Sequence, residues 1–422
     1  MNTFKKASIT YVVANFSRAI IPFILIPILT RYLSQEEYGQ IGMFQAFFSV
    51  ISAMMLMGTP ILGARKLYDE NFDEHALSKF NGSGVHLVGI SAIFFMCIFH
   101  LFGSYIVEYF SLPIKWIYFS VLLSISLFIF HLRLSNWQFR HEPLKYGFLS
   151  LFQALCILVL SLVFIVVFSL GVEGWIYAQL LAGLVVLITA YISLLHDKLI
   201  SIRFWNKLYL KEYLSYSLPL LPHIVGVVLL SFFDRIILNQ KMGLSNVGIY
   251  VVAVQVSMIL AILFDAINKA YTPWLFENLK KRDELDKILL VKNTYIYFLI
   301  IIAGTVFYVT IVPFFVFLLA GETYQEAGKI AILLCIGQLF HGMYLAVTNY
   351  IFFTKKTSFL SLGTVSSVVI HLCLLLLLIE LYGLIGAAIA FVFSKLCQFL
   401  ITWYMSNKCF HMPWMFFLKQ NA

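Results

Sequence analysis

Apolar runs long enough to cross a membrane recur along almost the whole chain, and short polar segments separate them. About 20 apolar residues span the hydrocarbon core of a bilayer, so each run predicts one transmembrane helix. The predicted helices are Ile9–Thr30, Ile41–Gly63, Gly84–Phe110, Lys115–Asn136, Gly147–Leu170, Trp175–Leu195, Ser215–Asn239, Gly248–Thr272, Thr294–Ala320, Ile330–Phe353, Phe359–Ile379 and Leu384–Met405. The pattern therefore predicts an all-α polytopic membrane protein with about twelve transmembrane helices.

Composition agrees with this pattern and argues against several classes of protein. Hydrophobic residues make up 61% of the 422 residues and charged residues 12%, whereas soluble chains carry about 25% charged residues. The longest predicted connections, residues 64–83, 196–214 and 273–293, are too short for a nucleotide-binding domain. The sequence contains no P-loop, HExxH, GxSxG or CxxC motif. We therefore expect a transporter without an ATPase motif, not an enzyme, and six cysteines that serve packing.

The basic residues lie mostly in alternate loops. The chain carries 29 Lys and Arg against 20 Asp and Glu, a net charge of +9. Of the basic residues, 20 fall in the two termini and the loops on their side, whereas 4 fall in the opposite loops. This distribution is the positive-inside bias, and it predicts that both termini are cytoplasmic. The basic excess therefore reflects topology and does not indicate a nucleic-acid partner.

The two halves of the chain resemble each other at a nearly constant shift. Gly39 corresponds to Gly248 at 209 residues, and Phe148–Leu151 corresponds to Phe359–Leu362 at 211 residues. Six helices per copy give both copies the same orientation, which predicts a parallel repeat about an axis normal to the membrane. The predicted parts are a six-helix lobe (1–195), a basic cytoplasmic interfacial linker (196–214), a second six-helix lobe (215–405) and a cytoplasmic tail (406–422). Two such lobes around a shared cavity are typical of a transporter.

Ionisable residues inside the predicted helices are the candidate functional residues, because each costs at least about 2.5–3.5 kcal/mol at a helix centre. Arg18 in the first helix and Lys395 in the twelfth lie near the midplane, judged from the rise per residue. Neither has an acid within one turn of its own helix. Their charge predicts an anionic substrate group such as a pyrophosphate. Asn15, on the same helix as Arg18, is a further candidate for substrate binding.

The other charges within helices leave alternatives open. Asp265 and Lys269 are four residues apart and share a helix face, as either a structural or a functional pair. Asp234 and Arg235, near the outer end of the seventh helix, fit either interfacial charges or the site. We predict substrate binding by Arg235 and Lys269, and ion coupling by Asp265 and Asp234. Arg133, near an inner helix end, is expected to extend its guanidinium to the interface.

Several short motifs resemble those of polysaccharide flippases. They are Leu29–Ser34 followed by Glu37–Gly39, then Asp234–Leu238, Val247–Tyr250 and Asn268–Trp274. Over essentially its whole length, the chain resembles the Wzx-type O-antigen branch of the multidrug/oligosaccharidyl-lipid/polysaccharide exporter superfamily. The resemblance implies two six-helix lobes that alternate between inward-open and outward-open states around a cationic cavity.

The resemblance also implies a cargo and a location. The cargo is an undecaprenyl-pyrophosphate-linked oligosaccharide, an O-antigen repeat unit, moved from the inner to the outer leaflet of the bacterial inner membrane. No cofactor is expected, coupling to protons or sodium fits the superfamily, and the partners are inner-membrane lipids, a glycan polymerase and chain-length machinery. Two alternatives remain. A multidrug/cation antiporter of the same superfamily is disfavoured by the basic midplane, and a membrane glycan polymerase by the short outer loops.

Overall fold

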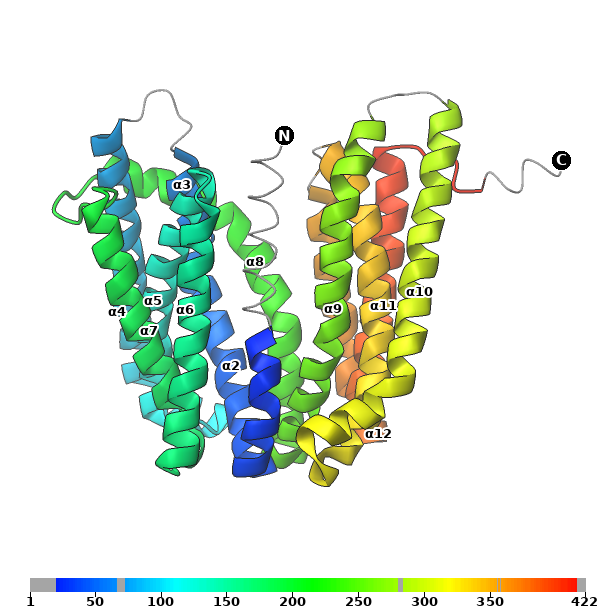
Figure 1. Ribbon diagram of the computed structural model, residues 1–422, viewed down its shortest axis with the longest axis horizontal. Coiled ribbons are helices and arrows are strands. Elements are labelled where there is room, and N and C mark those ends of the chain that lie inside the picture. The colour runs from blue at the N-terminus through cyan, green and yellow to red at the C-terminus, as the bar shows by residue number, and fades with distance from the viewer. Residues whose placement is uncertain (1–19, 67–72, 280–283, 355, 357, 416–422) are drawn as a thin grey trace. The chain divides into compact units, whose positions relative to one another are not determined.

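The computed structural model describes residues 20–66, 73–279, 284–354, 356 and 358–415, and in these residues the secondary structure is helical without strands. A first helix covers Ile20–Tyr32. The elements that follow (Figure 1) are α2 (Gln35–Leu56), α3 (Thr59–Arg65), α4 (Glu74–Phe110), α5 (Ile114–Phe139), α6 (Pro143–Leu162), the π-helix η2 (Val163–Val167), α7 (Gly171–His196), α8 (Lys207–Met242), α9 (Leu244–Leu279), α10 (Glu284–Ala320), the 3-10 helix η3 (Glu322–Tyr324), α11 (Gln325–Phe353) and α12 (Ser358–Cys409).

These helices agree with the predicted membrane spans. Among the described residues, nine helical segments are long and apolar enough to cross a membrane. One of them, Leu362–Cys409 in α12, overlaps both of the last two predicted spans, while Ile20–Tyr32 and α8 correspond to the first and seventh. Large apolar side chains lie on the outside of the bundles, where Leu101, Phe148 and Phe307 are 72%, 73% and 69% exposed. Such surfaces suit lipid and not water, so the protein is a multi-pass membrane protein.

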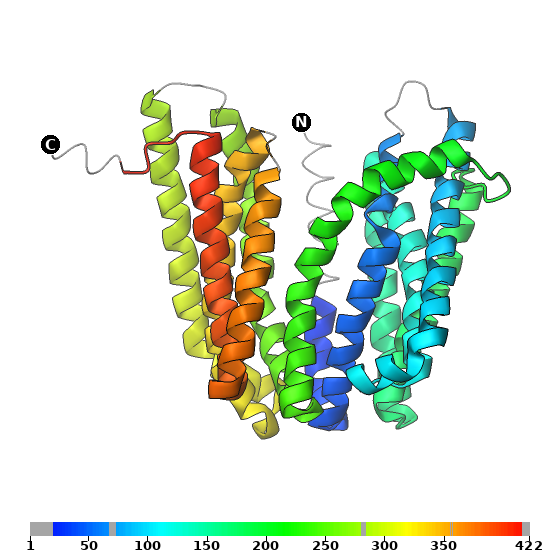
Figure 2. The ribbon, with the colours of Figure 1, turned by 180° about the vertical axis from the view of Figure 1, so that it is seen from behind.

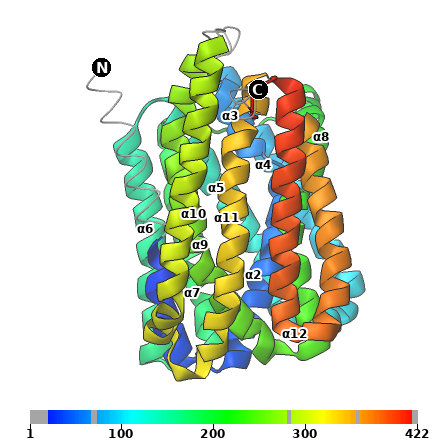
Figure 3. The same cartoon turned by 90° about the vertical axis from the view of Figure 1, so that its right-hand side faces the viewer.

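The chain divides into two compact units, the described residues up to Gly248 and those from Ile249 onward. In the first unit, α4, α6 and α7 pack around α5, and α8 packs on α2 and α4. In the second unit, α10 packs on α11 and α11 on α12 (Figure 3). By its contacts α8 belongs to the first unit, whereas the sequence placed most of this helix in the second lobe. The lobe boundaries at residues 195 and 214 stay a prediction.

The connection between α7 and α8 is shorter than the predicted linker. Helix α8 begins at Lys207, because the side-chain oxygen of Asn206 accepts a hydrogen bond from the N–H of Leu208 at 2.9 Å. The connection also packs against α4, where Asn81 Nδ2 donates to the carbonyl oxygen of Leu199 at 2.8 Å. The non-helical residues 197–206 are therefore held on the helical bundle of the first unit.

Two irregularities interrupt the long helices. Helix α8 is bent (Figure 2), and it contains Pro219 and Pro222, each of which removes a backbone hydrogen bond. Element α12 consists of two helical segments that meet at Gly383, with a φ of 55° and a ψ of −132°. The two segments run side by side in Figure 3. The backbone reverses here at a glycine, which adopts a positive φ without a side-chain clash.

The predicted repeat is visible in the helix boundaries. Helix α4 covers residues 74–110 and α10 covers 284–320, so both ends are displaced by 210 residues. Helix α2 begins at residue 35 and α9 at residue 244, a displacement of 209 residues. The same order of helices therefore occurs twice along the chain.

Candidate functional site

Lys395 lies in the second segment of α12 and is half-buried. Its Nζ donates to Oε1 of Gln398 at 3.2 Å and lies 5.6 Å from the centroid of the Phe391 ring. His341 on α11 lies within electrostatic reach of the Lys395 charge. An amide oxygen and an aromatic face stabilise an ammonium without neutralising it. A role of Lys395 in binding an anionic group stays a prediction.

Asp265 and Lys269 form the ion pair that their spacing on α9 allows. Lys269 Nζ lies 2.5 Å from Asp265 Oδ2, and the two side chains are 66% and 47% exposed. The prediction that the two residues share a helix face is confirmed. Its role in substrate binding and ion coupling stays a prediction.

Asp234 and Arg235 lie on α8 and differ in their surroundings. Asp234 is 5% exposed. Arg235 is half-buried, and its Nη1 donates to the carbonyl oxygen of Gly42 on α2 at 2.8 Å. Arg235 therefore contacts the neighbouring helix directly. Substrate binding by Arg235 and ion coupling by Asp234 stay predictions.

Two predicted substrate-binding residues, Arg18 and Asn15, lie outside the described residues. Of the remaining five, the structure pairs Asp265 with Lys269 on one face of α9. Lys395 lies on another element of the same unit, α12. Asp234 and Arg235, on α8, belong to the first unit.

Two sets of polar contacts between helices of the second unit, made by buried and half-buried groups, were not predicted. Asn349 Nδ2 on α11 donates to Oδ1 of Asn268 on α9 at 2.8 Å, and Thr272 Oγ1 donates to Asn349 Oδ1 at 3.2 Å. The hydroxyl of Thr294 lies 3.0 Å from the hydroxyl of Tyr350. These groups carry no charge to mark them in the sequence, although polar groups between helices join the helices in a membrane. Asn268 was within reach of sequence reasoning, since it begins one of the family-like motifs.

Helix α2 and the first turn of α9 cross at two glycines. A Cβ atom on Gly39 would lie 2.0 Å from the carbonyl oxygen of Leu244, and one on Gly248 would lie 2.1 Å from that of Gln35. The contact is reciprocal, because positions 35 and 39 correspond to 244 and 248 at the shift of the sequence repeat. Ser245 Oγ adds a hydrogen bond to Gln35 Oε1 at 2.8 Å. Corresponding segments of the repeat, in α2 and at the start of α9, therefore meet so closely that neither Gly39 nor Gly248 has room for a side chain.

The motif before Gly39 fixes the start of α2. Ser34 Oγ accepts from the N–H of Glu37 at 3.2 Å, and Glu37 Oε2 accepts from the N–H of Ser34 at 2.9 Å, which is a capping box. The other carboxylate oxygen of Glu37 accepts from the N–H of Val172 at 3.3 Å, at the start of α7. The motif therefore joins the start of α2 to the start of α7.

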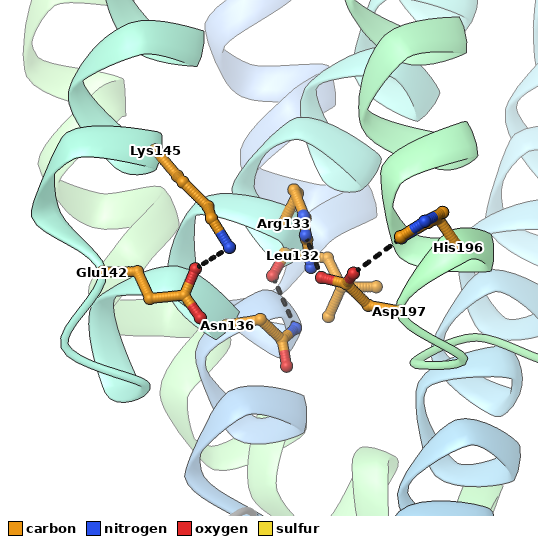
Figure 4. Close-up of polar contacts among 7 residues, drawn as sticks. All are labelled: Leu132, Arg133, Asn136, Glu142, Lys145, His196 and Asp197. Atoms are coloured by element: carbon orange, nitrogen blue, oxygen red, sulfur yellow. Dashed lines mark hydrogen bonds and ion pairs between the residues drawn. The ribbon is translucent and has the colours of Figure 1, made fainter.

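Arg133 does not extend to the interface, and that prediction is wrong. The side chain is 1% exposed, pairs with Asp197 just after α7 (Figure 4), and lies 4.0 Å from the centroid of the Trp137 ring. Spacing along the chain did not reveal this partner, because the pair comes from two helices that only the fold brings together. Burial raises the pKa of Asp197, but hydrogen bonds from Arg133 and His196 outweigh it and hold that pKa below its usual value.

Comparisons with known proteins agree with the resemblance seen in the sequence motifs. The chain is similar to "Lsg locus putative protein 1" of Haemophilus influenzae, with 25% identity over 377 residues that cover 88% of this chain and 90% of that protein. It is also similar to a putative O-antigen transporter of Shigella flexneri, with 27% identity over 247 residues that cover 57% of each chain.

Several solved structures share the fold, and two of them are compared with the chain. One is a multidrug resistance MATE family transporter of the MOP superfamily in an inward-facing conformation, with a TM-score of 0.75 and 14% identity, covering 98% of this chain and 96% of that one. The other is the lipid II flippase MurJ in an inward closed conformation, with a TM-score of 0.75 and 14% identity, covering 94% and 87%. The family model described as "Polysaccharide biosynthesis protein" matches residues 4–279. Since this match covers more than half of the 422 residues, the chain belongs to the polysaccharide biosynthesis protein family.

Proposed function

We propose that this protein is a flippase for a lipid-linked oligosaccharide. The observation that carries the proposal is membership of a polysaccharide biosynthesis family together with a helical fold like that of a lipid II flippase. The cargo would be an undecaprenyl-pyrophosphate-linked repeat unit, which moves from the inner to the outer leaflet of the bacterial inner membrane. Alternating access would expose the polar cavity to each side in turn while the polyprenyl tail stays in lipid.

In this proposal, Arg18 and Lys395 attract the pyrophosphate. A pyrophosphate without a counter-charge is very costly in hydrocarbon, and cations at the depth of these residues reduce that cost. The half-buried Lys395, held by Gln398 and the Phe391 ring, presents its ammonium as a point charge. Asn15, Arg235 and Lys269 would hold the remaining polar parts of the substrate.

Ion coupling would act through Asp265, with Asp234 as a second candidate acid. Proton or sodium binding at the Asp265 carboxylate removes the attraction that holds Lys269 at 2.5 Å. The released ammonium of Lys269 would then be available to the substrate. Coupling and substrate binding would thereby share one ion pair on α9.

The orientation also belongs to the proposal. Both termini would face the cytoplasm, as the basic loops predict, and the glycan would leave on the opposite side. A glycan polymerase and chain-length machinery would act on the repeat units there.

The test follows lipid-linked glycan in a strain that lacks this protein. A membrane-impermeant reagent that modifies sugars only at the outer face reports which leaflet holds the intermediate, and a strain complemented with the intact gene is the control. Accumulation of protected repeat units supports the flippase. Single units labelled at the outer face would point to a polymerase. Normal glycan with increased drug sensitivity would point to a multidrug antiporter and contradict the proposal.

A further inference from the structure

A cavity of about 560 Å³ lies where the ends of α4 and α8 meet in the first unit. Its volume is within the range of about 300–1,000 Å³ that is typical of small-molecule sites. The lining side chains that can form hydrogen bonds are Tyr105, Glu108, Tyr109, Ser111, Asn239 and Gln240. In the predicted topology both helix ends are at the outer face of the membrane.

Packing joins the two helix ends that line this cavity. Phe110, the last residue of α4, lies 5.7 Å from the Phe232 ring of α8 and 5.2 Å from the Phe47 ring of α2, measured between centroids. Asn239 Nδ2 of α8 donates to Ser111 Oγ, directly after α4, at 3.0 Å. The two helix ends are therefore joined by aromatic contacts and a hydrogen bond, so the polar and aromatic groups keep their relative positions.

Two aromatic rings form one wall. Tyr105 and Tyr109 are four residues apart on α4 and lie on the same face of the helix. Their exposed fractions are 73% and 52%, so both rings are accessible to a ligand. A tyrosine combines an apolar ring face with a hydroxyl that donates and accepts hydrogen bonds.

The polar groups beside the rings suit a neutral polyhydroxylated ligand. Glu108 contributes a carboxylate acceptor, whereas the amides of Asn239 and Gln240 each carry both donors and an acceptor. Among the described lining residues there is no Lys or Arg, so the cavity does not suit a pyrophosphate.

We infer that this cavity binds a saccharide, with pyranose C–H faces on Tyr105 and Tyr109 and sugar hydroxyls on Glu108, Asn239 and Gln240. The inference rests on the proposed function, since the cavity would receive the glycan as it leaves on the outer face. The lipid carrier's phosphates would remain with the basic residues of the translocation path. The two regions would thus recognise different parts of the same substrate.

The test is saccharide binding to the purified full-length protein in lipid nanodiscs, measured by saturation-transfer NMR. The probe is the repeat-unit oligosaccharide released by mild acid from the surface glycan of the native strain. We expect saturation transfer to the sugar protons of wild type and binding about tenfold weaker for Tyr105→Ala/Tyr109→Ala. Tyr105→Phe/Tyr109→Phe keeps both rings and should retain most of the binding.

Tyr382→Ala is the matched control, because Tyr382 is 59% exposed and is expected at the outer face of the second unit. Equal binding by wild type and Tyr105→Ala/Tyr109→Ala would overturn the inference. So would an equal loss in Tyr382→Ala, or a wild type without saturation transfer. The leaflet assay in the deletion strain is separate. A negative result there removes the flippase proposal, whereas a wild type without saturation transfer in the NMR experiment removes only the saccharide site.

Discussion

Replacing Gly39 by alanine tests whether α2 and α9 are held together by the reciprocal glycine contact. The new Cβ atom would lie 2.0 Å from the carbonyl oxygen of Leu244, whereas carbon–oxygen contacts of this kind are ordinarily about 3.3–3.6 Å. The helices must therefore part by more than about 1 Å at this point. Overpacking of this kind costs about 1–3 kcal/mol. Gly248→Ala should cost a similar amount, since its Cβ would lie 2.1 Å from the carbonyl oxygen of Gln35.

The free energy of unfolding in mixed micelles, measured by chemical denaturation, gives this cost. The two glycines share one contact, so the double variant should lose less than the sum of the single variants, by about 0.5 kcal/mol or more. Gly89→Ala is the control, because a Cβ there has no neighbour within 4 Å. That control should be neutral or stabilising, as alanine favours a helix over glycine by about 1 kcal/mol. Single variants as stable as wild type, or strictly additive losses, would refute the reasoning.

The remaining predictions concern charged residues. Asp197→Ala should lower the free energy of unfolding by about 3 kcal/mol, because it leaves the 1% exposed Arg133 without its counter-charge. Since the pKa of Asp197 is lowered in the folded protein, the stability from its carboxylate is complete above about pH 4 and is lost as the pH falls through the folded pKa. A pH series of unfolding midpoints should therefore be flatter for Asp197→Asn than for wild type. Lys395→Ala should reduce surface glycan at normal protein level, and unchanged glycan would contradict the role of Lys395 in pyrophosphate binding. Asp265→Asn should abolish the dependence of transport on an ion gradient, measured in proteoliposomes, with Lys292→Gln as a control outside the pair. Gradient-dependent transport in Asp265→Asn at the wild-type rate would exclude Asp265 as the coupling acid.

The membrane spans and the repeat could be predicted from the sequence without a structure. Membrane spans follow from apolar runs, because a bilayer imposes one length on every helix that crosses it. The repeat was likewise visible as a constant shift, and the α4 and α10 boundaries at 74–110 and 284–320 reproduce it. The pairing of Asp265 with Lys269 was also predictable, since residues four apart on a helix are neighbours wherever that helix packs.

Contacts between distant segments were decided only by the tertiary structure. Arg133 looked like an interfacial side chain because its partner, Asp197, lies far along the chain, directly after α7. The correspondence of Gly39 with Gly248 could be seen in the sequence. The sequence did not show that each glycine packs against the backbone of the corresponding segment. The sequence by itself determined which segments are helical and which residues are charged within the membrane. The fold determined which of these groups meet, because side-chain contacts depend on helix packing, which local periodicity does not encode.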